Sequence, residues 1–143
     1  MTIYFYSIRE QYGCFSNFSP HGFILDDLYW STSEHYFQAQ KFLGTPHLEQ
    51  IRLAKTPKEA AKMGRERTRP LRQDWLEVKD DIMRKAVLRK FETHVDIREI
   101  LLSTGDEEII ENSPIDYYWG CGADGSGKNM LGIILMEIRD QWR

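Results

Sequence analysis

The stretch WSTSEHYFQAQKF, residues Trp30–Phe42, decides how the middle of this chain folds. It predicts a mostly apolar helix with a well-marked start. Ser31 followed three residues later by Glu34 fits a capping box, and the two residues between them are alternative caps. Gly44 and Pro46 come shortly afterwards and predict the end of the helix, because both residue types interrupt helical geometry.

Three side chains that carry a charge or an amide are expected to lie in one line on this helix. Glu34, Gln38 and Lys41 are spaced by four and three residues, which places them on one face, with Phe37 and Phe42 beside them. A carboxylate and an amine between aromatic rings are typical of a reaction site. The alternative is a pair of ordinary solvated charges, which is the usual state of glutamate and lysine.

The composition indicates one soluble globular domain that spans residues 1–143, with 41% hydrophobic and 29% charged residues. A net charge of −3 argues against broad non-specific nucleic-acid binding. The sequence has neither an apolar run of about 18 residues nor a signal peptide, so we expect a cytoplasmic protein without a membrane partner. The cysteines and histidines lack the spacing of metal ligands, and neither a metal nor a cofactor is expected.

The pattern of elements predicts an α+β fold: a single compact domain, helix-rich, with a small N-terminal β-sheet. Strands are expected at Thr2–Ser7, Phe23–Leu25, Leu28–Trp30 and Glu108–Glu111. After the helix at Trp30–Phe42, further helices are expected at Glu49–Ala54, Pro57–Met63, Trp75–Phe91, Ile97–Ser103 and Met130–Trp142.

A glycine-rich loop near the C-terminus matches two nucleotide-binding motifs, and both matches are interpreted as false. Gly122–Lys128 has P-loop spacing, but Asn129 stands where a P-loop has serine or threonine. Gly120–Gly125 satisfies GxGxxG, but Asp116–Trp119 before it is a poor strand. The N–H groups at the start of the helix from Met130 could still bind a phosphate, with a plain turn as the alternative.

Two other loops are candidates for substrate contact. Tyr12–Pro20 mixes aromatic and polar residues, so Asn17 and Phe18 could bind and stack on a heterocycle. Core anchoring by Phe15 and Phe18 is the alternative interpretation. The run Gly64–Arg72 holds four arginines suited to phosphate, with a solvated surface as the alternative.

Six sequence blocks, in this order, together carry a family resemblance. They are FYS at Phe5–Ser7, YGCFSNFSP at Tyr12–Pro20, WSTSEHYFQAQKF at Trp30–Phe42, GR at Gly64–Arg65, DW at Asp74–Trp75, and SPIDYYWGCG through GKNMLG at Ser113–Gly132. The chain closely resembles the NADAR, or YbiA-like, N-glycosidases over nearly its whole length. The resemblance implies hydrolysis of the N-glycosidic bond of phosphoribosylamino-pyrimidine intermediates of riboflavin synthesis, with release of ribose 5-phosphate. Some members of the family remove ADP-ribose from guanine bases.

The chemistry of this bond suggests roles for individual residues. Cleavage at an anomeric carbon passes through an oxocarbenium-like state, which Glu34 could stabilise or assist as a general base. The resemblance suggests Lys41 as a nucleophile that forms a Schiff base, and Asp116 as a catalytic residue that supplies an acid or recognises the base. The expected substrate-binding residues are Asn17, Phe18, Trp30, Gln38, Arg65, Trp119, Gly120, Lys128 and Asn129.

The partner implied by the resemblance is a small-molecule phosphoribosyl or ADP-ribosyl substrate, with nucleic acid only where ADP-ribosylated guanine is the substrate. Two alternatives remain open at this point, an ADP-ribosyl-guanine hydrolase and a non-catalytic module that binds ADP-ribose or a nucleotide. A binding module has no need of an inward carboxylate and amine two turns apart. The presence of Glu34 and Lys41 therefore favours an enzyme.

Overall fold

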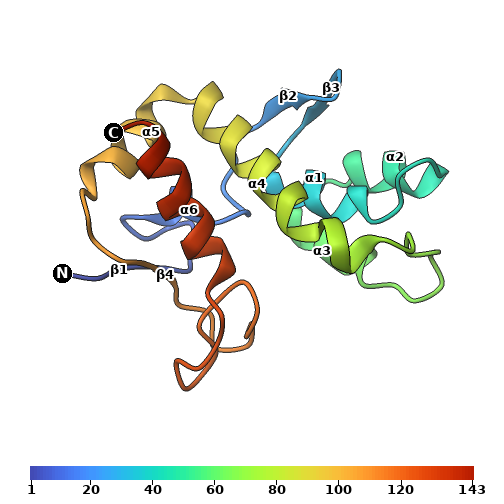
Figure 1. The fold of residues 1–143 in the computed structure, drawn as a ribbon. Helices are drawn as coiled ribbons and strands as arrows, with labels where there is room; N and C mark the ends of the chain where they lie inside the picture. The colour runs from blue at the N-terminus through green and yellow to red at the C-terminus, as the bar shows by residue number, and fades with distance from the viewer. The chain divides into compact units, whose positions relative to one another are not determined.

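A computed structural model describes all residues 1–143 and confirms a helix-rich α+β fold (Figure 1). The chain divides into two compact units, one of residues 20–90 and one of residues 1–19 with 91–143. The elements in chain order are β1 (Ile3–Phe5), a 3-10 turn (Gly13–Phe15), β2 (Phe23–Leu25), β3 (Leu28–Trp30), α1 (Ser33–Gln40), α2 (Pro46–Arg52), α3 (Pro57–Gly64), α4 (Trp75–Thr93), α5 (Val95–Ser103), β4 (Ile109–Glu111) and α6 (Met130–Gln141).

The unit of residues 20–90 begins with the antiparallel hairpin of β2 and β3, which has the predicted bounds. Asp26 and Asp27 form its two-residue turn in the left-handed region, at φ 54° and 64°. This geometry is that of a type I′ turn, whose twist matches that of the flanking strands. Asp26 is fixed further by hydrogen bonds from Tyr36 Oη (2.7 Å) and Lys85 Nζ (2.7 Å).

Threonine caps define the starts of the three short helices in this unit. Thr32 is the N-cap of α1 and accepts a hydrogen bond from the His35 N–H, so the helix begins at Ser33 and not at Trp30. Thr56 caps α3 at the predicted position. The predicted start of α2 is wrong by three residues, because Pro46 occupies the first turn of α2 and does not end the preceding helix.

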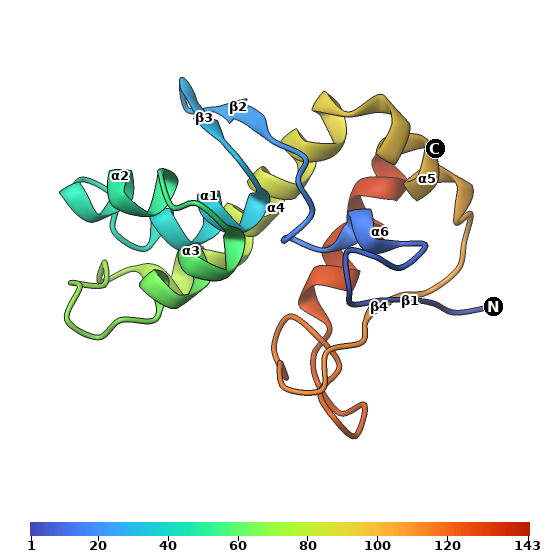
Figure 2. The same cartoon turned by 180° about the vertical axis from the view of Figure 1, so that it is seen from behind.

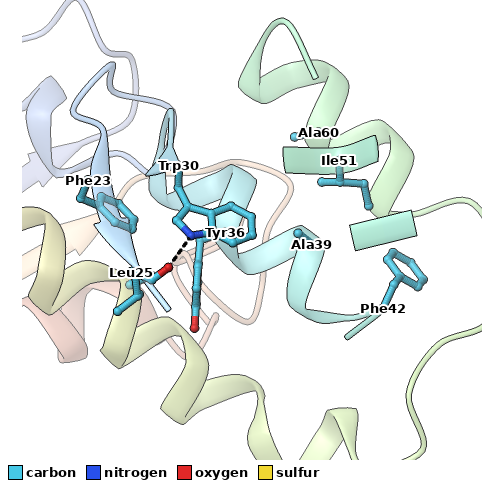
Figure 3. Packing of buried hydrophobic residues seen from close by; sticks show 9 residues of the cluster. Phe23, Leu25, Trp30, Tyr36, Ala39, Phe42, Ile51 and Ala60 are labelled. Atoms are coloured by element: carbon cyan, nitrogen blue, oxygen red, sulfur yellow. Dashed lines mark hydrogen bonds between the residues drawn. The ribbon is translucent and has the colours of Figure 1, made fainter. Parts of the chain in front are cut away.

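A hydrophobic cluster joins the hairpin to these helices (Figure 3). It consists of Phe23, Leu25, Trp30, Tyr36, Ala39, Phe42, Ile51, Ala60 and Ala86. Trp30 is fully buried, donates from Nε1 to Leu25 O at 2.9 Å, and meets the Tyr36 ring edge-on at 5.0 Å (Figure 3). The prediction of Trp30 as a stacking surface for substrate is therefore wrong, because both faces of the indole are packed in the core.

The buried side chain of His35 is expected to make the stability of the fold depend on pH. The side chain is fully buried between Thr32 Oγ1 (2.8 Å) and Ala54 O (2.9 Å), and burial lowers its pKa from 6.5. Below about pH 6.5, His35 binds a proton in the unfolded chain but stays neutral in the folded one. The free energy of unfolding should therefore fall by up to about 1.4 kcal/mol for each pH unit of acidification. Urea titrations between pH 7.5 and 5 measure this slope. A His35→Asn variant with an undiminished slope would contradict this assignment.

The unit of residues 1–19 and 91–143 holds the second small sheet, in which β1 pairs in parallel with β4 (Ile3 opposite Ile109). Helix α6 packs along β4, and α5 lies beside α6 (Figure 2). Asn129 precedes α6 in the left-handed region at φ 54°. Its side chain accepts from Glu111 N and donates to Ile109 O, both at 2.9 Å, and so fastens the helix start to β4.

Candidate active site

Glu34 and Gln38 lie buried on one face of α1, as the spacing predicted. Their exposed fractions are 9% and 6%, and Gln38 Nε2 donates a hydrogen bond to Glu34 Oε2 at 2.8 Å. The alternative of a solvated charge is therefore wrong for Glu34. The amide nitrogen of Gln38 is engaged with this carboxylate, which makes Gln38 a support for Glu34 and argues against its predicted role in substrate binding.

Lys41 caps the C-terminus of α1 and lies among aromatic rings. Its Nζ donates to Gly64 O at 3.2 Å and lies 6.0 Å from the ring centre of Phe37 and 5.8 Å from that of Trp75. These two rings pack together at 5.0 Å. One backbone acceptor and two aromatic faces replace much of the water that an exposed ammonium group would have.

This environment makes the amine of Lys41 easier to deprotonate. Burial lowers its pKa from 10.5, and the charges of Arg65 and Lys79 lower it further, against the opposing effect of Glu34. A larger fraction of neutral amine is then present at a given pH. A neutral amine is the nucleophilic form of lysine, so this environment is compatible with the predicted covalent role of Lys41, which stays a prediction.

A cavity of about 420 Å³ adjoins Lys41 within the unit of residues 20–90. The lining includes Lys41, Trp75 and the arginines at 65, 67 and 69. Arg69 is already engaged, since it donates to Glu66, His47 and Gln50. Arg65 and Arg67 are exposed and have no side-chain partner, so both are available to an anion.

Arg72 contributes to the site by holding the end of α1. It pairs with Asp74 through Nε (2.6 Å) and Nη2 (3.0 Å), and donates from Nη1 to Gln40 O at 3.2 Å. The Arg72 N–H donates to Lys41 O at 3.0 Å. Of the basic run, Arg69 and Arg72 therefore fix the loop, which leaves Arg65 and Arg67 for ligand contact. The sequence did not distinguish these two roles.

The glycine-rich loop of the other unit does not offer the expected N–H groups. Gly127 N donates to Cys121 O (2.7 Å), and Asn129 N donates to Gly120 O (3.0 Å). The N–H of Lys128 likewise donates to a backbone carbonyl, that of Tyr117. The prediction of a phosphate site on these N–H groups is therefore wrong, because the loop satisfies them internally. The side chain of Asn129 fastens α6 to β4 through two hydrogen bonds, and its predicted role as a substrate contact stays a prediction.

The side chain of Lys128 is still available in this loop. It is exposed, and its Nζ lies 5.4 Å from the ring centre of Tyr118. Gly120 is buried, and a Cβ there would come within 2.9 Å of Ser113 Cβ and 3.0 Å of Glu111 O. The tight packing of the loop thus explains the glycine at 120 without a contact to substrate.

Asp116 shapes the same loop. Its Oδ1 accepts hydrogen bonds from the N–H groups of Tyr118 (2.9 Å) and Trp119 (2.8 Å). The Trp119 ring meets the Tyr118 ring edge-on at 4.9 Å. One carboxylate oxygen of Asp116 therefore has a structural function. The predicted roles of Asp116 and Trp119 toward the base stay predictions.

The aromatic loop Tyr12–Pro20 was predicted either to contact substrate or to anchor the core, and the structure gives different answers for its two phenylalanines. Phe15 is buried and packs edge-on against Phe5 at 5.8 Å, so it anchors the core. Phe18 is 37% exposed and its ring is available for stacking, while Asn17 is buried. The roles of Asn17 and Phe18 as substrate contacts stay predictions.

The remaining features bear on metal binding and membranes. No three histidine, cysteine or acidic side chains are grouped so that they could hold a metal ion. None of the helices combines the length and the apolar character needed to cross a bilayer.

Comparison with known proteins gives a consistent likeness in sequence and fold. A model of the NADAR domain matches residues 4–143. The chain is 58% identical to an N-glycosidase of Nostoc punctiforme, over 100% of this chain and 94% of that protein. It is 50% identical to N-glycosidase YbiA of Escherichia coli, over 97% of this chain and 87% of that protein.

A solved structure and a plant protein extend this likeness. The NMR structure of E. coli YbiA matches with a TM-score of 0.91 and 49% identity, over 99% of this chain and 84% of that one. A chloroplastic riboflavin biosynthesis protein of Zea mays is 40% identical over 97% of this chain, which spans only 25% of the plant protein.

Proposed function

The chain belongs to the NADAR family, and we propose that it hydrolyses the N-glycosidic bond between a heterocyclic base and a ribose 5-phosphate group. It is a hydrolase of N-glycosyl compounds, as its identity of 50–58% with N-glycosidases over nearly the whole chain indicates. For the substrate we propose phosphoribosylamino-pyrimidine intermediates of riboflavin synthesis. The similarity to a riboflavin biosynthesis protein of Zea mays supports this choice.

The observation that carries the proposal is a half-buried amine with a lowered pKa beside a buried carboxylate, Lys41 and Glu34. In the proposed reaction the lone pair of Lys41 Nζ bonds to C1′ while the electrons of the C1′–N bond leave with the base, which takes up a proton. Nζ then loses a proton, and the sugar ring opens to give an imine. Water adds to the imine carbon to give a carbinolamine. Breakdown of the carbinolamine releases ribose 5-phosphate and restores the amine.

Glu34 acts on the charge that develops in this reaction. Positive charge builds up at C1′ in the transition state, and a carboxylate held in a water-poor site stabilises such charge more strongly than one in bulk water. The hydrogen bond from Gln38 occupies Oε2 and fixes the orientation of the carboxylate. Glu34 is also suited to accept the proton that Nζ loses, or one from the attacking water.

The non-catalytic alternative is disfavoured by the same two residues. A module that only binds a nucleotide gains nothing from removing a carboxylate and an amine from water, because each costs desolvation energy. Glu34 is only 9% exposed, and burial lowers the pKa of Lys41. Such costs are expected where the groups react with a substrate.

The test is direct incubation with two substrate classes. A phosphoribosylamino-pyrimidine and an ADP-ribosylated guanine nucleotide are each mixed with the enzyme, and released base is followed by chromatography, with Lys41→Ala as the matched inactive control. We expect free pyrimidine and ribose 5-phosphate from the first. Release only from the second would transfer the proposal to ADP-ribosyl-guanine hydrolysis. Release from neither would overturn it.

The arginines of the cavity provide a prediction about the phosphate. If Arg65 and Arg67 bind the 5′-phosphate, Arg65→Ala or Arg67→Ala should lower kcat/KM for the phosphorylated substrate by about 10–100-fold, the value of a charge-assisted hydrogen bond. Activity on the dephosphorylated nucleoside should hardly change. Lys128→Ala, in the other unit, tests the remaining cationic candidate in the same way.

The control for this comparison is Lys58→Ala, which removes one positive charge from the exposed side of α3 outside the cavity. It should leave the ratio of kcat/KM between phosphorylated and dephosphorylated substrate within about twofold, because a single exposed charge is screened by solvent. An unchanged ratio in the variants at 65 and 67 would exclude the cavity as the phosphate site.

A further inference from the structure

Gly64, the last residue of α3, contacts Lys41 directly and is linked to Glu34 through Gln38. Helix α3 packs against α1 at this point. A Cβ on Gly64 would overlap Gln38 Oε1 and would lie 2.7 Å from Gln38 Cδ and 3.0 Å from Gln38 Cβ. Its carbonyl oxygen accepts the hydrogen bond from Lys41 Nζ at 3.2 Å. One glycine therefore confines the partner of Glu34 and holds the amine of Lys41.

The side-chain amide of Gln38 has little freedom in this arrangement. Gln38 is 6% exposed, its Nε2 donates to Glu34, and its Oε1 has no hydrogen-bond partner. Reversing the amide would place an oxygen against the carboxylate, so the observed orientation is the favourable one. An unpaired buried acceptor is destabilising, which indicates that the position of this amide is set by the bond to Glu34 and by contact with Gly64.

The carbonyl of Gly64 has a matching effect on Lys41. A neutral amine has two N–H donors and one lone pair. When one N–H is donated to Gly64 O while the rings of Phe37 and Trp75 flank the group, the directions open to the lone pair are restricted. Such restriction favours attack, because nucleophilic reactions are sensitive to alignment.

We propose that Gly64 and Gln38 are positioning residues that align Glu34 and Lys41 together, with Gly64 as the shared support. This inference rests on the proposed function, in which Glu34 and Lys41 react with the substrate. Neither positioning residue needs to touch the substrate. The absence of a side chain at position 64 is required by the approach of α3 to α1, since Gly64 does not have a positive φ and the backbone there would accept alanine.

The test is a double-mutant cycle of Gly64→Ala and Gln38→Ala, with Lys62→Ala on the exposed side of α3 as the matched control. Gly64→Ala should lower kcat by about 100-fold, because a displacement of about 1 Å at a reacting group has an effect of this size. Affinity for ribose 5-phosphate, measured by calorimetry, should change little. Lys62→Ala should match the wild type in both measurements.

The double variant separates positioning from a general loss of structure. Alanine at position 38 makes room for the new methyl group, so the double variant should be no slower than Gln38→Ala alone. It should also melt at a higher temperature than Gly64→Ala, by a few degrees. The proposal is overturned if the two effects on kcat multiply, if Gly64→Ala retains wild-type kcat, or if the double variant fails to fold while Gln38→Ala folds.

The two proposals fail in different ways. A wild-type enzyme that releases no base contradicts the proposed function, whatever the variants do. The coupling of melting temperatures between positions 38 and 64 does not depend on activity and still tests the packing. An active wild type with independent effects of the two substitutions contradicts only the positioning roles of Gly64 and Gln38.

Discussion

Replacement of Lys41 by alanine is expected to lower kcat by more than about 10⁴-fold, while the domain stays folded. Loss of acid–base assistance alone reduces rates by about 10²–10⁴-fold, and loss of the nucleophile removes the covalent route as well. The Lys41 side chain makes one hydrogen bond, to Gly64 O, so its removal should not unfold the protein. Single-turnover base release and a thermal melt measure the two effects.

Lys41→Arg is the matched control for this prediction. Arginine keeps the positive charge and much of the length of lysine but does not lose its proton near neutral pH, so it cannot act as a nucleophile. The variant should therefore be as inactive as Lys41→Ala. Substantial activity of Lys41→Arg would show that position 41 supplies only charge and would refute the covalent role.

Replacement of Glu34 by glutamine is expected to lower kcat by about 10²–10⁴-fold. The amide keeps the shape of the carboxylate but removes the charge that stabilises the transition state. A second effect is expected on the pH profile. Glu34 raises the pKa of Lys41, so its neutralisation should move the rising limb of the kcat profile to lower pH.

The wild-type profile should rise with pH to a midpoint below 10.5, because the deprotonated amine is the reactive form and burial lowers its pKa. Arg65→Ala provides the opposite control, since Arg65 lowers the pKa of Lys41 and its loss should move the limb to higher pH. Shifts in the same direction for Glu34→Gln and Arg65→Ala would contradict the assignment of the limb to Lys41.

Local signals in the sequence predicted most of the secondary structure. The hairpin has its expected bounds because Asp26 and Asp27 adopt the left-handed conformation that a two-residue turn requires. The capping signal before α3 was also sufficient, since Thr56 accepts from the Glu59 N–H. The signal at Pro46 was misread as the end of the preceding helix, whereas this proline occupies the first turn of α2.

The site was predictable only where it depended on helix periodicity. The spacing placed Glu34 beside Gln38, and the hydrogen bond between them follows from that spacing. Contacts between residues of different elements were not predictable. Examples are the hydrogen bond from Lys41 Nζ to Gly64 O and the one from Trp30 Nε1 to Leu25 O in the core. A tryptophan in a motif is equally consistent with stacking on a ligand and with burial, and only the tertiary structure decides between them.

The glycine-rich loop illustrates a further limit. Its composition predicted free N–H groups before α6. Whether an N–H is free, however, depends on whether a carbonyl elsewhere in the loop can accept a hydrogen bond from it. Gly127 and Asn129 both find such carbonyls, at Cys121 and Gly120. The conformation that allows this requires a positive φ at Gly122 and Gly125, 74° and 80°, which the sequence permits but does not specify.

Borohydride reduction during turnover tests the central claim most directly. The enzyme is incubated with a phosphoribosylamino-pyrimidine, reduced, digested and analysed by mass spectrometry. If Nζ of Lys41 forms an imine with the opened sugar, the peptide that carries Lys41 should gain the mass of a reduced ribose 5-phosphate. Lys41→Arg and a reaction without substrate should show no adduct. An unmodified Lys41 under demonstrated base release would contradict the covalent mechanism and assign the attack to water.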